Sequence, residues 1–159
     1  MRHEHRLTVR SHECDANGHV NNAVYLNYLE DARVAFLRAV GTSYRELIER
    51  GFGLMVVQVK IDYRGQAFME DPLLVVTQPI GRRYTGGTFS QKVYREEGSR
   101  PVLIADAEVT WVCVNSEKKP ARLPPFLATP ALDPVGEEAS ETRAAEHPAG
   151  NPLSSGDPG

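Results

Sequence analysis

The stretch from Ala23 to Val40 limits the fold of this chain more than any other segment. Its apolar residues recur with the spacing of one helical face, at positions 25, 29, 32, 36 and 40. Asn21 or Asn22 suits the N-cap of this helix, and Gly41 suits its C-cap. Positions beside that face are apolar too, and only a narrow strip is charged: Glu30, Asp31, Arg33 and Arg38. A helix with so wide an apolar stripe needs cover on most of its sides.

The rest of the folded part predicts a β-sheet as that cover. Residues 5–12 predict a first strand and residues 43–50 a short second helix. Four more strand-like runs follow, separated by turn signals, at 54–63, 73–80, 88–95 and 102–114. Apolar and polar residues alternate between Ala105 and Cys113, which gives that strand one dry face. We expect an α+β domain in which an antiparallel five-stranded sheet lies against one long helix.

Composition divides the 159 residues into one domain and a tail. Eight of the eleven prolines lie from Pro120 onward, among alanine, glycine, serine and glutamate. Such a segment buries too little apolar surface to offset its ordering entropy. We expect a folded domain over residues 1–125 and a disordered proline-rich tail over residues 126–159, either inert or used for interaction.

Charge and cysteine content exclude several functional classes. The formal net charge is −3 and no dense lysine or arginine block occurs, which argues against a nucleic-acid partner. No apolar run approaches the ~20 residues that span a bilayer, so we expect no membrane partner. Cys14 and Cys113 lie far apart and outside any C-x-x-C pair, and His3, His5 and His12 lack further ligands at a suitable spacing. We expect a soluble cytoplasmic protein with no metal and no cofactor.

The segment from Cys14 to Asn22, just before the long helix, holds the densest group of polar residues. A helix N-terminus presents unpaired N–H groups that can stabilise an oxyanion. Asp15 beside it can act as a general base or a nucleophile, and Asn17 and His19 can hold a substrate or a water. The same residue types also form ordinary helix-entry loops without chemistry.

The spacing D-x-N-G-H-V-N-N-x-x-Y, followed by Y-L-E-D-A-R, resembles the active-site segment of hotdog-fold acyl thioesterases of the 4-hydroxybenzoyl-CoA thioesterase class. The resemblance extends from about Arg6 to Pro125. It implies a hotdog fold, in which the five-stranded sheet wraps around the central helix. It also implies that two protomers join their sheets and that active sites form at the dimer interface.

The same resemblance implies roles for particular residues. Asp15 matches the catalytic carboxylate, and the backbone N–H of Asn22 matches the group that polarises the thioester carbonyl. The Asp15 to His19 spacing is also similar to plant acyl-carrier-protein thioesterases, which implies that Asn17 and His19 assist. Gln66 stands where the plant enzymes carry a glutamate, and it could orient a water or a carbonyl.

Two further sets of residues are candidates for substrate binding. Tyr25 is a core aromatic whose hydroxyl could reach the site. Arg82 and Arg83 could hold the phosphates of coenzyme A, and so could three other basic residues: Lys60, Arg64 and Lys92.

The hypothesis that follows is a hydrolase for acyl thioesters of coenzyme A or acyl carrier protein, working as a homodimer or a tetramer of dimers. The alternative is a noncatalytic acyl-thioester-binding module on the same fold. A hotdog dehydratase is a third interpretation, which the thioesterase motif disfavours.

Overall fold

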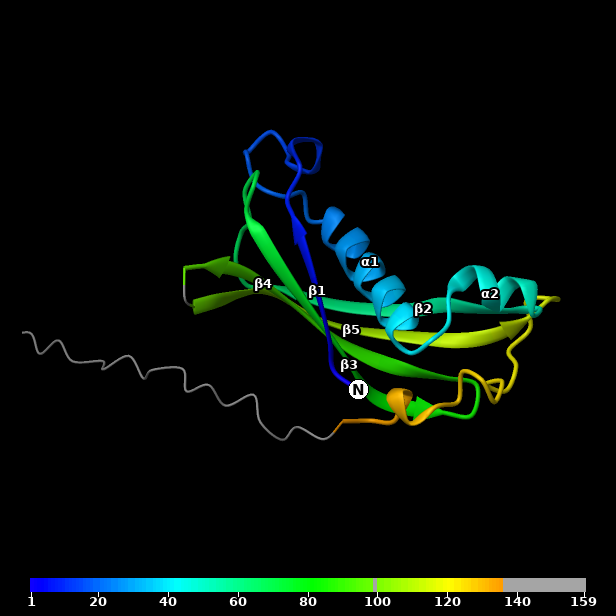
Figure 1. Ribbon diagram of the computed structural model, residues 1–159. Coiled ribbons are helices and arrows are strands. Elements are labelled where there is room, and N and C mark those ends of the chain that lie inside the picture. The colour runs from blue at the N-terminus through cyan, green and yellow to red at the C-terminus, as the bar shows by residue number, and fades with distance from the viewer. Residues whose placement is uncertain (99, 136–159) are drawn as a thin grey trace, which may run out of the picture.

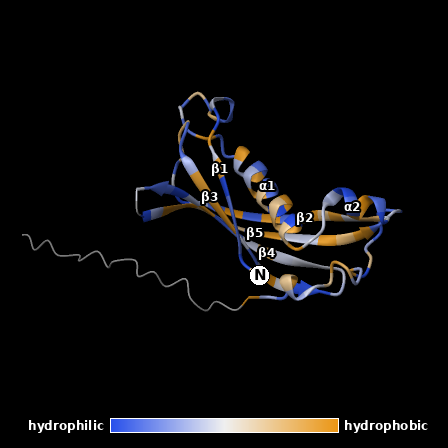
Figure 2. Cartoon of the chain, in the orientation of Figure 1, coloured by the Kyte–Doolittle hydropathy of each residue, from blue (hydrophilic) through white to orange (hydrophobic). Residues whose placement is uncertain are grey.

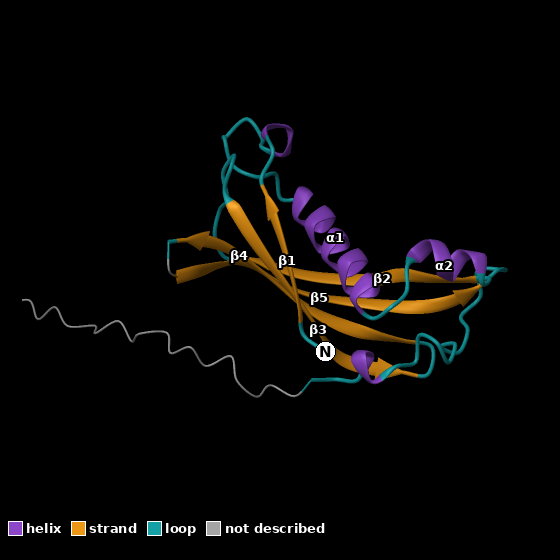
Figure 3. Ribbon diagram, in the orientation of Figure 1, coloured by secondary structure: helices purple, strands orange, loops and turns teal. Residues whose placement is uncertain are grey.

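Residues 1–98 and 100–135 are described by the computed structural model of this chain (Figure 1). In chain order the elements are β1 (His3–Thr8), η1 (Ser11–Glu13), α1 (Val24–Ala39), α2 (Tyr44–Glu49), β2 (Phe52–Tyr63), β3 (Pro72–Arg83), β4 (Gly86–Glu97), β5 (Arg100–Asn115) and η2 (Pro130–Leu132). The strands form one antiparallel sheet in the order β1-β3-β4-β5-β2, and α1 lies across one face of it (Figure 3). The expected α+β hotdog fold is confirmed.

The ends of α1 follow from side-chain and backbone hydrogen bonds. The Oδ1 atom of Asn21 accepts from the backbone N–H of Ala23 at 2.9 Å, so Asn21 supports a helix whose N-cap residue is Ala23 rather than an asparagine. Gly41 has a φ of +87°, and the N–H of Thr42 reaches back to the carbonyl of Leu37 at 3.0 Å. This is a Schellman ending, which glycine favours. No helix among the described residues is long and apolar enough to cross a membrane.

The core lies between α1 and the sheet, where Figure 2 shows hydrophobic positions on the helix and the strands. Leu29, Ala32 and Phe36 of α1 are at most 1% exposed. They face alternate residues of β5, from Ala105 to Cys113, which are at most 5% exposed. The predicted dry face of the last strand is confirmed, and burial of these side chains supplies most of the driving force for folding.

Arg33 departs from the predicted charged strip of the helix, because its side chain is buried. Its Nη1 donates to Gln91 Oε1 at 2.7 Å. Gln91 Nε2 in turn donates to Thr77 Oγ1 and to the carbonyl of Leu29, both at 2.9 Å. The hydrogen bond to Gln91 on β4 therefore allows Arg33 to be buried, although the sequence pattern predicted that Arg33 is exposed to solvent.

The ordered chain continues past the predicted boundary at residue 125. Leu127 and Leu132 are 1% and 3% exposed and join the apolar cluster around Phe36. Phe126 packs on Phe52, with ring centroids 6.1 Å apart, and the Arg50 guanidinium lies over its ring. The expectation of disorder therefore fails for residues 126–135, because these apolar side chains close one end of the core. Residues 136–159 of the predicted tail lie outside the described residues.

Candidate active site

A tight turn between β1 and α1 holds Asp15 beside His19. Cys14 and Val20 form an antiparallel bridge, and the N–H of Asp15 donates to the carbonyl of His19 at 2.9 Å. The N–H of Gly18 closes the turn on the carbonyl of Asp15 at 3.0 Å. Gly18 has a φ of +82°, a conformation that other residues adopt only with strain. The glycine of the motif is thus explained by the turn.

The Asp15 carboxylate has one oxygen fixed and the other less constrained. Its Oδ1 accepts from the backbone N–H of Asn17 at 2.8 Å, and its Oδ2 lies 3.8 Å from His19 Nδ1. The side chains of Asp15 and His19 are 27% and 28% exposed. The Asn17 contact is made by its backbone, and this residue is exposed. A water or a substrate can therefore approach Oδ2.

Asn22 stands at the entrance of α1 and is positioned by the end of β2. The hydroxyl of Tyr63 donates to the Asn22 carbonyl at 2.8 Å. Among the residues that the structure describes, no acceptor meets the backbone N–H of Asn22. Such an N–H at a helix entrance is available to an incoming carbonyl oxygen. Sequence reasoning did not single out Tyr63, because a terminal strand tyrosine carries no signal of its contact with a distant loop.

The loop that follows β2 brings Gln66 to the same end of the molecule. His19 and Phe68 form an isolated bridge, and the N–H of Val20 donates to the carbonyl of Ala67 at 2.8 Å. Gln66 itself is exposed, and its carbonyl accepts from Arg95 Nη1 at 2.7 Å. The structure thus gathers the predicted residues of both loops near the start of α1.

Tyr25 is a core residue that packs against the end of β2. Its side chain is 2% exposed, and its ring meets that of Tyr63 edge-on at 5.4 Å. Burial raises the pKa of Tyr25, and the backbone hydrogen bond from Ala67 opposes that rise. Tyr25 therefore packs behind the two loops.

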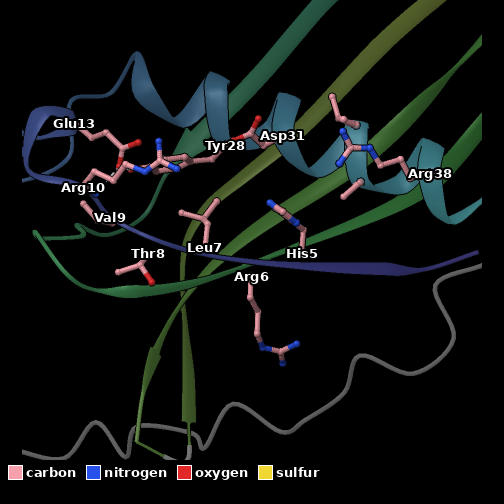
Figure 4. A pocket seen from close by; sticks show the side chains of 12 residues that line it. His5, Arg6, Leu7, Thr8, Val9, Arg10, Glu13, Tyr28, Asp31 and Arg38 are labelled. Carbon is pink, nitrogen blue, oxygen red and sulfur yellow. Dashed lines mark hydrogen bonds between the residues drawn. The ribbon is translucent and has the colours of Figure 1, made fainter. Parts of the chain in front are cut away.

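A second carboxylate close in sequence to Asp15 serves a different cavity. Glu13 Oε2 accepts from the Tyr28 hydroxyl and from the backbone N–H of Arg10, both at 2.7 Å. Burial, followed by the hydrogen bond to Glu13, raises the pKa of Tyr28 far above its ordinary value. These residues line a polar cavity of about 550 Å³ between β1 and α1, here called the β1 cavity. Figure 4 shows Arg10, Glu13 and Tyr28 at one end of it and Arg38 at the other.

On the other side of α1 a groove lined by both apolar and polar residues runs beside β2. This β2 groove, of about 350 Å³, begins one helical turn beyond Asn22. Its apolar lining residues are Leu26, Leu29, Leu54, Val56 and Val59, and its polar ones are Asn27, Glu30, Arg33 and Tyr44. The exposed fractions of Val56 and Val59 are 44% and 37%. The groove therefore offers an apolar surface that starts at the helix entrance.

Arg82 and Arg83 lie at the opposite end of the sheet from Asp15, as the course of β3 in Figure 1 shows. At about 3.3 Å per residue, the eleven steps from Pro72 to Arg83 span roughly 36 Å. Arg82 pairs with Asp133, and the Arg122 guanidinium lies 5.2 Å from the ring centre of Tyr84. The three arginines Arg82, Arg83 and Arg122 line, with Phe52 and Tyr84, an open cavity of about 870 Å³, here called the arginine end.

The structure does not gather the other predicted basic residues at that end. Arg64 pairs with Asp106 at 3.7 Å, while Lys60 and Lys92 stand opposite Glu108 and Asp106 in the strand register. These three residues instead face strand carboxylates elsewhere on the sheet.

Comparison with known proteins identifies the family. The family model of the thioesterase-like superfamily matches residues 9–130. The chain belongs to this superfamily. It is 31% identical over 116 residues to the long-chain acyl-CoA thioesterase FadM of Escherichia coli (strain K12), an alignment covering 73% of this chain and 86% of FadM. It is 29% identical over 122 residues to the chloroplastic acyl-acyl carrier protein thioesterase ATL2 of Arabidopsis thaliana, covering 77% of this chain and 64% of that protein.

A solved structure agrees with the fold. A mutant of 4-hydroxybenzoyl-CoA thioesterase in complex with 4-hydroxybenzoyl-CoA superposes with a TM-score of 0.73 at 19% identity, covering 78% of this chain and 94% of that one. The thioesterase resemblance predicted from the motif is confirmed at the level of the family.

Proposed function

We propose that this superfamily member is a hydrolase that cleaves acyl thioesters of coenzyme A or acyl carrier protein. One observation carries the proposal: the Asp15 carboxylate precedes the same helix entrance as the Asn22 N–H, which meets no acceptor within residues 1–98 and 100–135, and the β2 groove with its apolar side chains begins there. The names of the curated relatives support the same reaction. We place the enzyme in the cytoplasm, because the free thiols of Cys14 and Cys113 suit a reducing compartment.

The geometry favours Asp15 as a general base. The thioester oxygen accepts from the Asn22 N–H, which stabilises the negative charge that develops during attack. Asp15 Oδ2 takes a proton from a water held near His19, and the water oxygen bonds to the carbonyl carbon. The C–S bond then breaks, and the departing thiolate receives the proton from Asp15. Asn17 fixes the carboxylate through its backbone N–H, and the exposed Gln66 can orient the water from the neighbouring loop.

Direct attack by Asp15 is the other route, and isotope labelling separates the two. In a single turnover in ¹⁸O-water with enzyme in excess, general-base catalysis places the label in the released acid. An anhydride opened at the Asp15 carbonyl would leave ¹⁸O in the peptide that contains Asp15. Detection of ¹⁸O in that peptide by mass spectrometry would refute the general-base route.

The acyl group extends from Asn22 into the β2 groove in this proposal. Leu26, Leu29, Val56 and Val59 offer it an apolar wall, and burying that wall against an acyl chain contributes ~25 cal/mol per Å² of apolar surface. Tyr25 contributes by packing against Tyr63, whose hydroxyl positions Asn22.

A second copy of the chain completes the site. β2 pairs with β5 on one side only, and it exposes apolar side chains at Met55, Val56, Val57 and Val59. An open apolar edge invites strand pairing. Antiparallel pairing of two β2 strands sets the Phe52 end of one protomer beside the Tyr63 end of its partner. Arg82, Arg83 and Arg122 would then lie near the partner's helix entrance and bind the phosphates of the thiol carrier.

A thiol-release assay tests the proposed function. The purified chain is incubated with a panel of acyl-CoA and acyl-carrier-protein thioesters, and free thiol is measured. The expected result is catalytic release by the wild-type protein and loss of that release in Asp15→Asn. Binding of acyl-CoA without any thiol release would instead establish the noncatalytic binding module.

A further inference from the structure

The loop between β2 and β3, residues 64–71, contacts the turn that carries the proposed base. The N–H of Val20 donates to the carbonyl of Ala67 at 2.8 Å, and His19 forms a bridge with Phe68. Val20 and Ala67 are 3% and 0% exposed, so their hydrogen bond is shielded from water. A shift of this β2–β3 loop would therefore also displace the turn beside it.

The β2–β3 loop has a backbone conformation that its own residues do not favour. Glu70 has a φ of +71°, in the left-handed region that residues other than glycine adopt only with strain. The Asp71 side chain stabilises the same turn, because its Oδ2 accepts from the N–H of Phe68 at 2.8 Å. Strain of this kind persists only where the surrounding structure holds the backbone in place. The loop therefore depends on support from another element.

Arg95 on β4 stands where it can give that support. It lies opposite Leu73 in the strand register and continues the row of alternate residues Gln91 and Val93, all three of which are 0% exposed. Arg95 therefore occupies the inner face of the sheet, and its side chain is only 19% exposed. A charge in such a position is costly unless partners inside the domain meet it.

Most partners of Arg95 belong to the β2–β3 loop. Its Nη1 donates to the Gln66 carbonyl at 2.7 Å and lies 3.9 Å from Asp71 Oδ2. The guanidinium carbon lies 5.8 Å from the ring centre of Phe68, within the range of a cation–π contact. Its Nη2 pairs with Glu97 on the same strand. One planar guanidinium thus contacts three residues of the loop, which the single ammonium of a lysine is not shaped to do.

We propose that Arg95 is a positioning residue, which holds the β2–β3 loop against the turn of Asp15 and His19. It acts through the backbone of the loop and not on the reacting atoms. The inference rests on the proposed hydrolase function and names a further residue on which its rate depends. A displaced loop leaves Asp15 and His19 less well aligned with the attacking water, and small displacements of catalytic groups cost large factors in rate.

Steady-state kinetics of Arg95→Gln test the role. We expect kcat to fall by roughly ten- to a hundredfold while KM for an acyl-CoA stays near the wild-type value, because other residues line the β2 groove and the arginine end. Arg95→Lys keeps the charge without the planar fork and should recover part of the rate. Arg6→Gln is the matched control, since Arg6 pairs with Glu96 of the same strand at 3.4 Å and is 60% exposed. It should keep kcat within about twofold of wild type.

A second variant tests the contact from the side of the loop. Asp71→Asn keeps an acceptor for the Phe68 N–H and removes the negative charge that faces Arg95. We expect it to lower kcat severalfold at unchanged KM. In the double variant with Arg95→Gln it should add little further loss, because both changes break one interaction. Fully additive losses would show that the two residues act separately and would contradict the proposed role.

Amide hydrogen exchange, followed by NMR, reports on the loop without any turnover. In Arg95→Gln the Val20 N–H, which bonds to Ala67, should exchange at least about tenfold faster than in the wild type. The amide of the buried Val109, on the central strand β5, should keep its rate, and Arg6→Gln should change neither. This local change in a protein that hydrolyses no thioester would support the contact with the loop while rejecting the proposed function.

Two results would overturn the role of Arg95. One is a wild-type kcat in Arg95→Gln of an active enzyme, whatever the exchange rate of Val20, because the loop would then not govern the reaction. The other is faster exchange of Val20 and Val109 alike, with a loss of activity that follows the loss of folded protein. That outcome would assign Arg95 to the stability of the whole domain.

Discussion

The two flanks of α1 differ in the side chains that line the cavities beside them. On the flank toward β1, Glu13, Tyr28 and Arg10 bond to one another around a polar cavity. On the flank toward β2, a groove begins one helical turn beyond Asn22 and includes the apolar side chains of Leu26, Leu29, Val56 and Val59. Polar residues alone therefore do not mark the site. The flank with apolar side chains at the helix entrance is the one that suits an acyl group in the proposed function.

The two edge strands beside these flanks, β1 and β2, also differ in length and polarity. β1 has six residues, of which Glu4 and Arg6 form exposed ion pairs. β2 has twelve residues and exposes Met55, Val56 and Val57, whose exposed fractions are 48%, 44% and 58%. A short charged edge resists pairing, whereas a long apolar edge favours it. The site and the expected dimer contact therefore share one flank.

The largest expected effect separates the two carboxylates of the entrance loop. Asp15→Asn should lower kcat by roughly 10²–10⁴, the usual contribution of a positioned base. Glu13→Gln should leave kcat within about threefold of wild type, because the Glu13 oxygen that accepts from Tyr28 and Arg10 lies on the β1 flank, away from the proposed site. Thiol release by the two folded variants, with circular dichroism as the folding control, checks this. A large loss in Glu13→Gln with activity kept in Asp15→Asn would reverse the assignment.

The next largest effect concerns residues 126–135, which cover the end of the core around Phe36. A chain ending after residue 125 loses Leu127 and Leu132, which are buried beside Phe36, and we expect a loss of about 3–6 kcal/mol in unfolding free energy. A chain ending after Val135 keeps both leucines, and we propose that it retains the wild-type melting temperature and activity. Thermal unfolding of the two truncated chains gives the comparison. Equal melting temperatures for both would show that residues 126–135 do not stabilise the domain.

The third prediction compares substitutions on the two edge strands, β2 and β1. Wild-type protein should scatter light as a particle of at least twice 17.6 kDa. Val57→Lys places a charge on the apolar β2 edge and should yield monomers with at least about tenfold lower activity, because the partner's arginine end is then absent. Thr8→Lys makes the matched change on β1 and should preserve both mass and activity. An active monomer in Val57→Lys would refute the shared site.

Much of the fold was predictable from local patterns. The 3.6-residue period of the long helix and the alternation from Ala105 to Cys113 each reflect burial on one face, and the structure confirms both. Arg33 was predicted wrongly because its burial depends on Gln91, 58 residues away, and no local pattern records that contact. The early domain boundary was wrong for a similar reason, since Leu127 and Leu132 are too sparse to show a period.

The candidate site was predictable only where the motif is contiguous. Asp15, Asn17, His19 and Asn22 lie within eight positions, so their spacing carries the signal. Tyr63 joins them through a hydrogen bond to a residue 41 positions away in the sequence. Nothing in the sequence indicated that Arg82 and Arg83 lie roughly 36 Å from the Asp15 end of β3. Distances of this kind depend on the topology of the sheet.

The smallest expected effects concern two tyrosine hydroxyls, one on each flank of α1. Tyr28→Phe removes the donor to Glu13 and should lower stability by about 1 kcal/mol with little change in kcat. Tyr63→Phe frees the Asn22 carbonyl and should lower kcat by up to about tenfold, with a smaller stability change because the Tyr63 side chain is 44% exposed. A loss of activity in Tyr28→Phe that exceeds the loss in Tyr63→Phe would place catalysis on the β1 flank.

The dependence of stability on alkaline pH is an independent test of the same two tyrosines, Tyr28 and Tyr63. The pKa of Tyr28 is raised in the folded protein by burial and by the bond to Glu13, above an unfolded value of 10.0. The folded state therefore keeps a proton that the unfolded state releases above pH 10, and the stabilising contribution is complete below that pH and declines as the pH rises further. Urea unfolding between pH 9 and pH 11 should show a decline in the wild type and in Tyr63→Phe, and a shallower one in Tyr28→Phe. If the unfolding free energy declines equally with pH in all three proteins, the Tyr28 hydroxyl is not buried and bonded to Glu13 as the structure describes.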